Sequence, residues 1–111
     1  MEGHGRTARE ARVKALDIHR EARAELDKAI EWYNERRDGL GLDLHDEVNA
    51  ALARIEADPH VGARYRNTRF QFFRVRRFPY LIYYQELPDR IWVAAIAHGH
   101  RRPNYWRKRK P

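Results

Sequence analysis

Two short stretches in the second half of the chain carry the side chains best suited to chemistry. His98-Gly99-His100 runs directly into a pair of arginines, and further arginines precede it. An imidazole titrates near pH 6.5 and can move a proton at neutral pH, and a guanidinium can hold a phosphate through two parallel hydrogen bonds. If the chain cleaves a phosphodiester, this pattern offers one candidate set that could hold the phosphate, with a neighbouring base. That set is Arg74, Arg76, Arg101 and Tyr105, with His98 or His100 as the base.

The residues that other kinds of catalytic or metal site require are missing from the sequence. The chain has no cysteine, and the two neighbouring histidines have no Asp or Glu beside them, so they form a poor metal site. No glycine-rich phosphate loop, zinc motif or Ser-His-Asp signature occurs in the sequence. We therefore expect no metal and no cofactor.

Charge is divided unevenly along the chain. Residues 1–59 hold 10 basic and 14 acidic side chains, whereas residues 60–111 hold 13 basic side chains and only Glu86 and Asp89. The first part has a net charge of −4 and the second +11, for a total of +7. Such asymmetry favours a cationic surface that meets a polyanion or an acidic protein segment.

The chain of 111 residues is long enough for one domain. Its longest apolar run, Ile91 to Ala97, is far shorter than the roughly 20 residues of a membrane-spanning helix. The first residues do not resemble a signal peptide. We expect a cytoplasmic protein with no membrane partner, divided into a flexible arm (1–12), a folded domain (13–106) and a basic tail (107–111).

Two stretches show the apolar spacing of amphipathic helices. One stripe consists of Ala22, Leu26, Ala29, Ile30 and Tyr33, and the other of Leu44, Val48, Ala51, Leu52 and Ile55. Both follow the 3.6-residue period of an α-helix. The link 38–41 is short and contains two glycines, so the helices should form an antiparallel hairpin that ends at Pro59.

The rest of the domain is predicted to be β-structure. A weak strand signal lies within 11–18, and stronger ones lie within 69–78, 80–84 and 91–97, with Pro79 favouring a bend. The last is the most apolar and should be central, with Trp92 pointing outward or into a helix contact. The predicted fold is α+β: an N-terminal strand, the helical hairpin, then a three-stranded antiparallel meander with both helices on one sheet face.

Some aromatic and charged stretches allow two interpretations. Trp32-Tyr33 could be a binding platform, but Tyr33 continues the apolar stripe, which favours core packing. Alternation would turn two of the three tyrosines in 80–84 inward, which leaves Tyr83 as the one that could stack on RNA bases. The basic run 107–110 is either a flexible solvated tail or an anchor for an anionic partner.

Four segments together resemble the RelE/ParE toxins of bacterial type II toxin–antitoxin modules. They are Ala29–Tyr33, Gly39–Gly41, Arg77–Tyr84 and Ala97–Arg107, and the resemblance covers roughly residues 13–109. It implies an α+β toxin that a cognate antitoxin neutralises with an acidic or amphipathic segment. It also implies one of two targets: ParE-like members inhibit DNA gyrase by protein contact, whereas RelE-like members cleave ribosome-bound mRNA.

The resemblance also lets the two activities be compared at individual positions. Arg74 and Arg101 match cationic positions of the RelE-like, metal-independent nuclease pattern, but Phe72 and Leu81 stand where that pattern has cations. Tyr105 lies near the position of the nuclease tyrosine without coinciding with it. The incomplete pattern favours a ParE-like gyrase inhibitor, with ribosome-dependent mRNA cleavage as the alternative and a non-toxic nucleic-acid-binding domain third.

The same comparison suggests which side chains meet the antitoxin or the target. They are Arg74, Arg76, Arg77, Tyr83, Arg101, Arg102, Trp106 and Arg107. Within this set, Arg74, Arg76 and Arg101 are expected to meet carboxylates of an amphipathic antitoxin segment laid across the sheet and helices.

Overall fold

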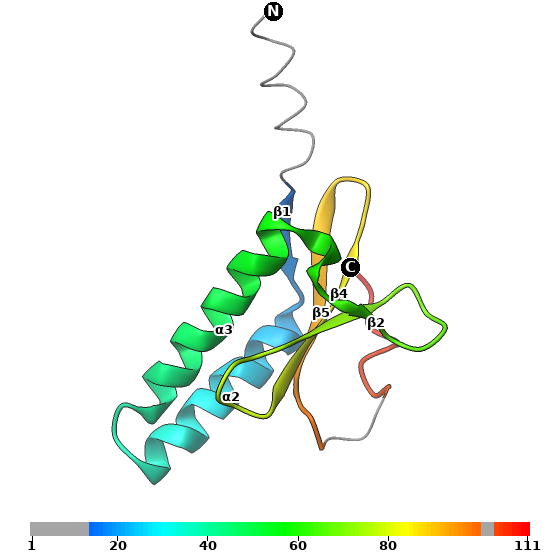
Figure 1. Cartoon of the computed structure of the whole chain (residues 1–111). Helices are drawn as coiled ribbons and strands as arrows, with labels where there is room; N and C mark the ends of the chain where they lie inside the picture. Colours follow the sequence, from blue (N-terminus) through cyan, green and yellow to red (C-terminus); the bar gives the residue numbers. More distant parts are fainter. Residues whose placement is uncertain (1–13, 101–103) are drawn as a thin grey trace, which may run out of the picture.

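The computed structural model of the chain describes residues 14–100 and 104–111, so the predicted arm, Arg101 and Arg102 lie outside the described residues. The elements follow in the order β1 (Ala15–Ile18), α2 (Arg20–Arg36), α3 (Leu40–Ala57), the 3-10 turn η1 (Pro59–Val61), β2 (Ala63–Arg64), β3 (Gln71–Arg74), β4 (Tyr80–Glu86) and β5 (Arg90–His98) (Figure 1).

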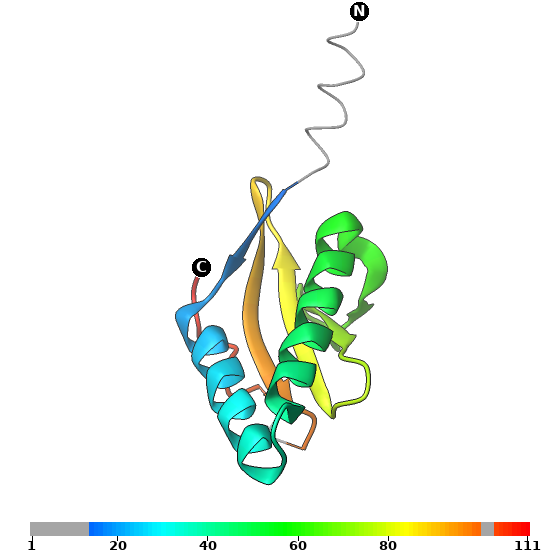
Figure 2. The ribbon, with the colours of Figure 1, turned by 90° about the vertical axis from the view of Figure 1, so that its left-hand side faces the viewer.

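The strands form one sheet in the order β1-β5-β4-β3-β2. β1 pairs with β5 in parallel, and every other neighbouring pair is antiparallel. Both helices cover the same face of the sheet (Figure 2). The predicted α+β fold is confirmed, with a two-residue strand, β2, that the sequence did not indicate.

The main core lies between the helices and the sheet. Both predicted stripes face it: Ala22 and Val48, for example, are fully buried. The helices meet closely at Gly41, whose amide donates a hydrogen bond of 2.7 Å to Asn34 Oδ1. A Cβ at position 41 would lie 2.4 Å from the Ile30 carbonyl oxygen, so this crossing requires glycine.

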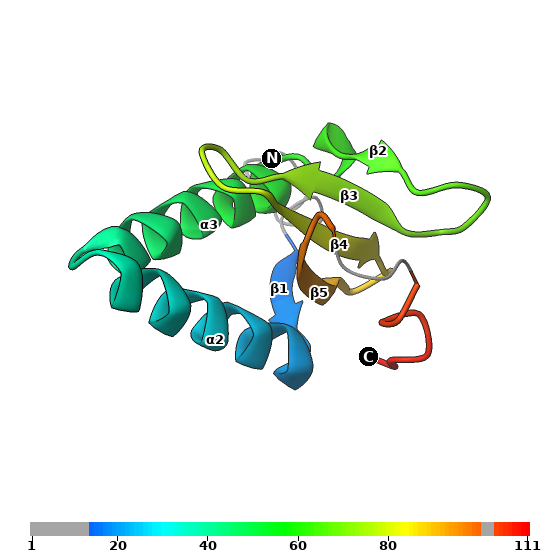
Figure 3. The same cartoon turned by 90° about the horizontal axis from the view of Figure 1, so that it is seen from below.

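The opposite face of the sheet is also covered. A second, aromatic core there joins Tyr65, Trp92, Trp106 and the partly buried Phe70, and it is closed by the β2–β3 loop and the segment after β5. Figure 3 shows this loop and the C-terminal segment on the side away from the helices. Trp92 is 1% exposed, so it points neither to solvent nor to the helices.

This double cover explains the continuous apolar run of β5, because a strand buried on both faces has no polar side. The sheet is therefore the middle layer of the domain. Among the described residues, no helix combines the length and apolar character needed to cross a membrane.

Candidate functional site

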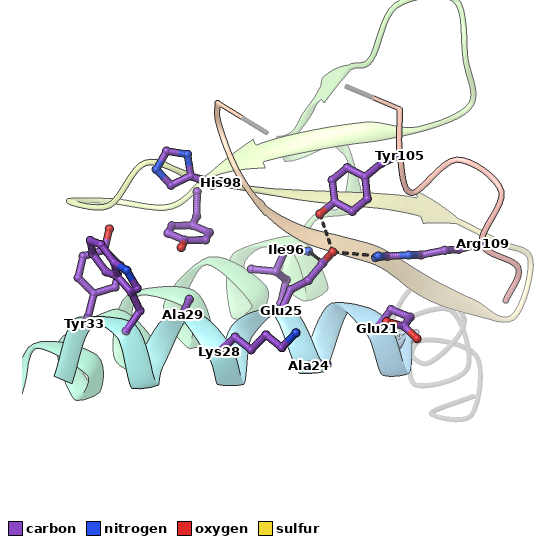
Figure 4. A pocket seen from close by; sticks show the side chains of 12 residues that line it. Glu21, Ala24, Glu25, Lys28, Ala29, Tyr33, Ile96, His98, Tyr105 and Arg109 are labelled. Atoms are coloured by element: carbon purple, nitrogen blue, oxygen red, sulfur yellow. Dashed lines mark hydrogen bonds and ion pairs between the residues drawn. The ribbon is translucent and has the colours of Figure 1, made fainter. Parts of the chain in front are cut away.

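A groove with a volume of about 640 Å³ opens between α2, the ends of β4 and β5, and the C-terminal segment (Figure 4). Its lining side chains come from all of these elements. They are Glu21, Ala24, Glu25, Lys28, Ala29, Trp32, Tyr33, Tyr80, Ile96, His98, Tyr105 and Arg109.

Glu25 connects three parts of the fold at one end of the groove. Its carboxylate accepts hydrogen bonds from the Tyr105 hydroxyl, from Arg109 Nη2 at 2.9 Å and from the Ile96 amide at 3.0 Å (Figure 4). The side chains of Glu25 and Arg109 are only 15% and 16% exposed. This shielded ion pair therefore fixes the C-terminal segment against α2 and β5.

The pair also satisfies the open edge of β5. β1 pairs with β5 only as far as Val93, and the register with β4 passes from Tyr83–Ala95 to Tyr84–Val93, which leaves Ala94 as an extra residue. Arg109 Nη1 donates to the Ala94 carbonyl at 2.8 Å, while Glu25 accepts from the Ile96 amide. Two side chains thus replace the missing strand, because backbone polar groups need partners when they are shielded from water.

The other end of the groove is aromatic. Tyr33, Tyr80 and His98 lie there, with ring centroids 6.3 Å apart for Tyr33–Tyr80 and 5.3 Å apart for Tyr80–His98. Trp32 is 48% exposed, and the Arg36 guanidinium carbon lies 3.5 Å from its ring centroid. This end offers apolar surface beside cations, which suits an amphipathic partner segment.

Arginines of the β3–β4 turn stand beside this aromatic end. The ring of Phe78 lies 5.1 Å from that of Tyr33, so the turn packs directly on α2. Arg76 and Arg77 are exposed, and Arg77 Nη2 is 3.7 Å from Asp43 of α3. The groove therefore has a cationic margin.

The structure separates the nuclease candidates. Arg74 is in register with Leu81, and Leu81 with Ala97, so these three share the sheet face opposite the helices. His98 is in register with Tyr80, which packs against the main core on the helix face. Arg74 and His98 thus belong to opposite faces of the same end of the sheet.

The remaining candidates for that site take other roles. The backbone amide of His100 donates to His98 Nδ1 at 3.0 Å, and His100 is exposed. Tyr105 directs its hydroxyl to Glu25. Arg101, the other predicted phosphate ligand, lies outside the described residues.

Three of the predicted contact residues lie at the second core. Trp106 is 1% exposed and stacks on Tyr83 with a centroid distance of 4.4 Å, so its indole is a packing residue rather than a surface contact. Tyr83 is partly buried between this indole and Tyr65. Arg107, the next residue, is exposed. A binding role through Trp106 would require the second core to open.

Two tyrosines of β4 have perturbed acidity. Burial raises the pKa of Tyr83, and the nearby Tyr65 adds to the rise while Arg66 opposes it. Burial likewise raises the pKa of Tyr84, whose hydroxyl donates to the Pro59 carbonyl at 2.7 Å and accepts from the Gly62 amide at 2.9 Å. Both hydroxyls therefore stay protonated well into the alkaline range.

Glu25 was not among the residues predicted to form a site, although its position carried a signal. It follows Ala22 by three residues and precedes Ala29 by four, which places a carboxylate on the apolar stripe of α2. Such a charge needs a partner. No group of three or more His, Cys, Asp or Glu in the described part of the chain could hold a metal ion.

Comparisons with known proteins agree with this architecture. A family model described as the ParE toxin of the type II toxin–antitoxin system parDE matches residues 16–103. A solved structure, a chromosomal ParDE toxin–antitoxin system from P. aeruginosa, superposes with a TM-score of 0.71 at 16% identity and covers 78% of this chain and 97% of that one. No curated protein matches the sequence.

Proposed function

Because the chain belongs to the ParE toxin family of type II toxin–antitoxin systems, we propose that it acts as a ParE-like inhibitor of DNA gyrase, neutralised by a cognate antitoxin. In this role the chain inhibits its target by direct protein contact and not by an enzymatic reaction.

The observation that supports this target most is the state of the sheet face opposite the helices. A RelE-like nuclease would need cations there to stabilise charge on the phosphate. In this chain Phe72 packs against Tyr65 and Tyr83, and Leu81 is likewise apolar. Arg74 remains on that face without His98 beside it. With Phe72 and Leu81 apolar, Arg74 is the one cation among these three strand positions, which favours protein contact over RNA cleavage.

The test compares the two activities with the same purified chain. We expect it to inhibit DNA supercoiling by gyrase and to leave translated mRNA intact. Cuts in ribosome-bound mRNA that disappear in the Arg74→Ala variant, with gyrase unaffected, would assign the chain to the nuclease class instead. Growth arrest on expression, relieved by co-expression of the gene beside it, serves as the control for toxin activity.

We further propose that the groove and its cationic margin receive the antitoxin. An amphipathic helix or strand could place apolar side chains against Trp32 and Tyr33 while its carboxylates meet Lys28 and the two arginines of the β3–β4 turn, Arg76 and Arg77. The groove offers the exposed ring of Trp32, and its positive charge comes from Lys28 and from the exposed arginines of the β3–β4 turn, because Arg109 is paired with Glu25.

Antitoxin affinity measured by calorimetry tests this surface. The double change Arg76→Glu and Arg77→Glu should weaken binding at least about tenfold, because two attractive contacts become repulsive. The control is Arg20→Glu with Arg23→Glu, which alters the net charge equally on the exposed side of α2. Equal losses in both variants would contradict the assignment, since they would indicate a general charge effect.

A further inference from the structure

A second cationic surface lies away from the groove, at the second core. Its side chains come from the β2–β3 region and from the segment after β5, and all are exposed. They are Arg64, Arg66, Arg69, Arg107, Lys108 and Lys110. We call this set the loop–tail patch.

The two halves of the patch are held together by the second core. The Tyr65 hydroxyl donates to Asn104 Oδ1 at 3.0 Å, and the ring of Phe70 lies 4.7 Å from that of Trp106. Arg69 precedes Phe70 and Arg107 follows Trp106, so this aromatic contact places the two arginines on neighbouring segments. Figures 1 and 3 show both segments on the side of the sheet away from the helices.

The backbone beneath the patch is ordered. In the β2–β3 loop, the Thr68 hydroxyl donates to the Tyr65 carbonyl at 2.6 Å and accepts from the Phe70 amide at 3.0 Å. On the other side, Arg109 is fixed by Glu25 and Ala94. Ordered backbone reduces the entropy lost when the charged side chains bind a partner.

The charges of the patch are not neutralised within the fold. No Asp or Glu occurs in residues 59–85 or 90–111. Within the described ranges, none of these six side chains forms an ion pair. Three other arginines of the same half of the chain do form one there: Arg77, Arg90 and Arg109. Several neighbouring cations without counter-charges are typical of a surface that meets a polyanion.

The low exposure of the aromatic side chains in the described part of the patch decides which polyanion fits. An amphipathic peptide needs apolar surface to cover, and single-stranded nucleic acid uses exposed rings for base stacking. Here Tyr65 is 8% exposed and Trp106 1%, and the large hydrophobic side chains exposed in the described residues, Trp32 and Leu42, lie on the helices. Positive charge therefore dominates the patch, which suits the phosphate backbone of a duplex.

We propose that the loop–tail patch binds duplex DNA through its phosphates, without reading the base sequence. This goes beyond the proposed toxin function and uses a different surface from the antitoxin groove. Arg66, whose guanidinium carbon lies 5.1 Å from the Tyr65 ring centroid, lies near the start of the β2–β3 loop and would be one of the contacts.

The test measures binding of the purified chain to a fluorescent DNA duplex of mixed sequence by anisotropy over a salt series. With four or five phosphate contacts, the logarithm of the affinity should fall with the logarithm of salt with a slope of roughly −4, at about −0.9 per contact. A slope near zero, or tighter binding to single-stranded RNA or to polyglutamate than to the duplex, would overturn the proposal.

Matched variants locate the surface. Arg69→Glu with Arg107→Glu should weaken duplex binding at least about tenfold and reduce the magnitude of the salt slope by about 2. The affinity of the Arg69→Lys with Arg107→Lys variant should stay within about threefold of that of the unaltered chain. Arg20→Glu with Arg23→Glu alters the net charge equally and should have the smaller effect. Equal losses of duplex affinity in the two Glu pairs would contradict the assignment of DNA binding to the loop–tail patch.

Antitoxin affinity keeps this result separate from the proposed function. The single variant Arg69→Glu, which leaves Arg107 unaltered, should keep its antitoxin affinity, and this result also shows that the variant is folded. If the Glu pair does not fold, Arg69→Gln with Arg107→Gln replaces it, because these changes remove both charges without reversing them; unchanged duplex affinity and salt slope in that variant would overturn the proposal.

Discussion

Glu25 shows how one side chain can determine where a distant segment lies. It is partly shielded from water on α2, and it holds Arg109, Tyr105 and the Ile96 amide at once. Its position on the apolar stripe could be read from the sequence, but its partners lie 71 to 84 residues away. Local periodicity contains no information about contacts at that separation, so the partners could not be predicted.

Replacing Glu25 with Ala should lower the free energy of unfolding by about 2 to 4 kcal/mol, because Arg109 and the Ile96 amide would lose their shared acceptor. Urea denaturation measures this loss. The matched control is Glu31→Ala on the same helix, where the side chain is exposed and a change within about 0.5 kcal/mol is expected. Equal effects at both positions would mean that the carboxylate at position 25 has no special role.

The hydroxyl of Tyr84 is a second residue with a defined contribution. It joins the Pro59 carbonyl and the Gly62 amide, and so fixes the turn that leads from α3 into β2. Tyr84→Phe should cost about 1 to 3 kcal/mol, because two shielded backbone groups lose their partner while the ring still fits. Thermal unfolding should show a lower Tm in this variant, and an unchanged Tm would contradict the role assigned to the hydroxyl.

At the scale of elements, the α2–α3 hairpin was the part that the sequence determined best. Both apolar stripes were continuous, and Gly39, with φ of +87°, ends the link in a conformation that favours glycine. The cover on the sheet face opposite the helices was not predicted. Its cover comes from a loop and from the segment after β5, whose aromatic residues follow no period that marks them as core.

The hairpin also gives a prediction about helix contact. Gly41→Ala should destabilise the fold by about 1 to 3 kcal/mol, since the new methyl group would overlap the Ile30 carbonyl and the Asn34 side chain. Gly99→Ala is the control, because a Cβ there would lie 3.5 Å from the Pro79 carbonyl oxygen, an ordinary contact. Chemical denaturation of both variants should separate them clearly, and similar losses would contradict the packing argument.

At the scale of the whole molecule, the uneven charge along the chain becomes two separate cationic surfaces. One borders the groove and includes Arg76 and Arg77, and the other is the loop–tail patch. The sequence predicted that the second half would present positive charge. The sequence could not predict that this charge would divide into two surfaces. The β2–β3 loop and the C-terminal segment are far apart along the chain, and they meet only in the second core.

The whole domain should lose stability at alkaline pH. The folded state keeps Tyr83 and Tyr84 protonated above their ordinary pKa of about 10, whereas the unfolded chain releases these protons there. Their stabilising contribution is therefore complete below about pH 10 and is lost as pH rises through the raised values, by at most about 1.4 kcal/mol per pH unit and per tyrosine.

Urea midpoints measured between about pH 9 and about pH 11 test this dependence. The Tyr83→Phe variant should show a shallower alkaline decline, because one of the two raised groups is removed. An equal decline in the variant and the unaltered chain would assign the effect to other residues.

The parallel pairing of β1 with β5 has a consequence for how the protein is made. A ribosome releases β1 first and β5 last among the strands, and the residues that seal the second core follow β5. Until they emerge, the helical hairpin has no finished sheet to rest on, and neither cationic surface has its supporting backbone. We therefore expect a growing chain to lack both binding surfaces until synthesis has passed β5 and the residues that close the second core.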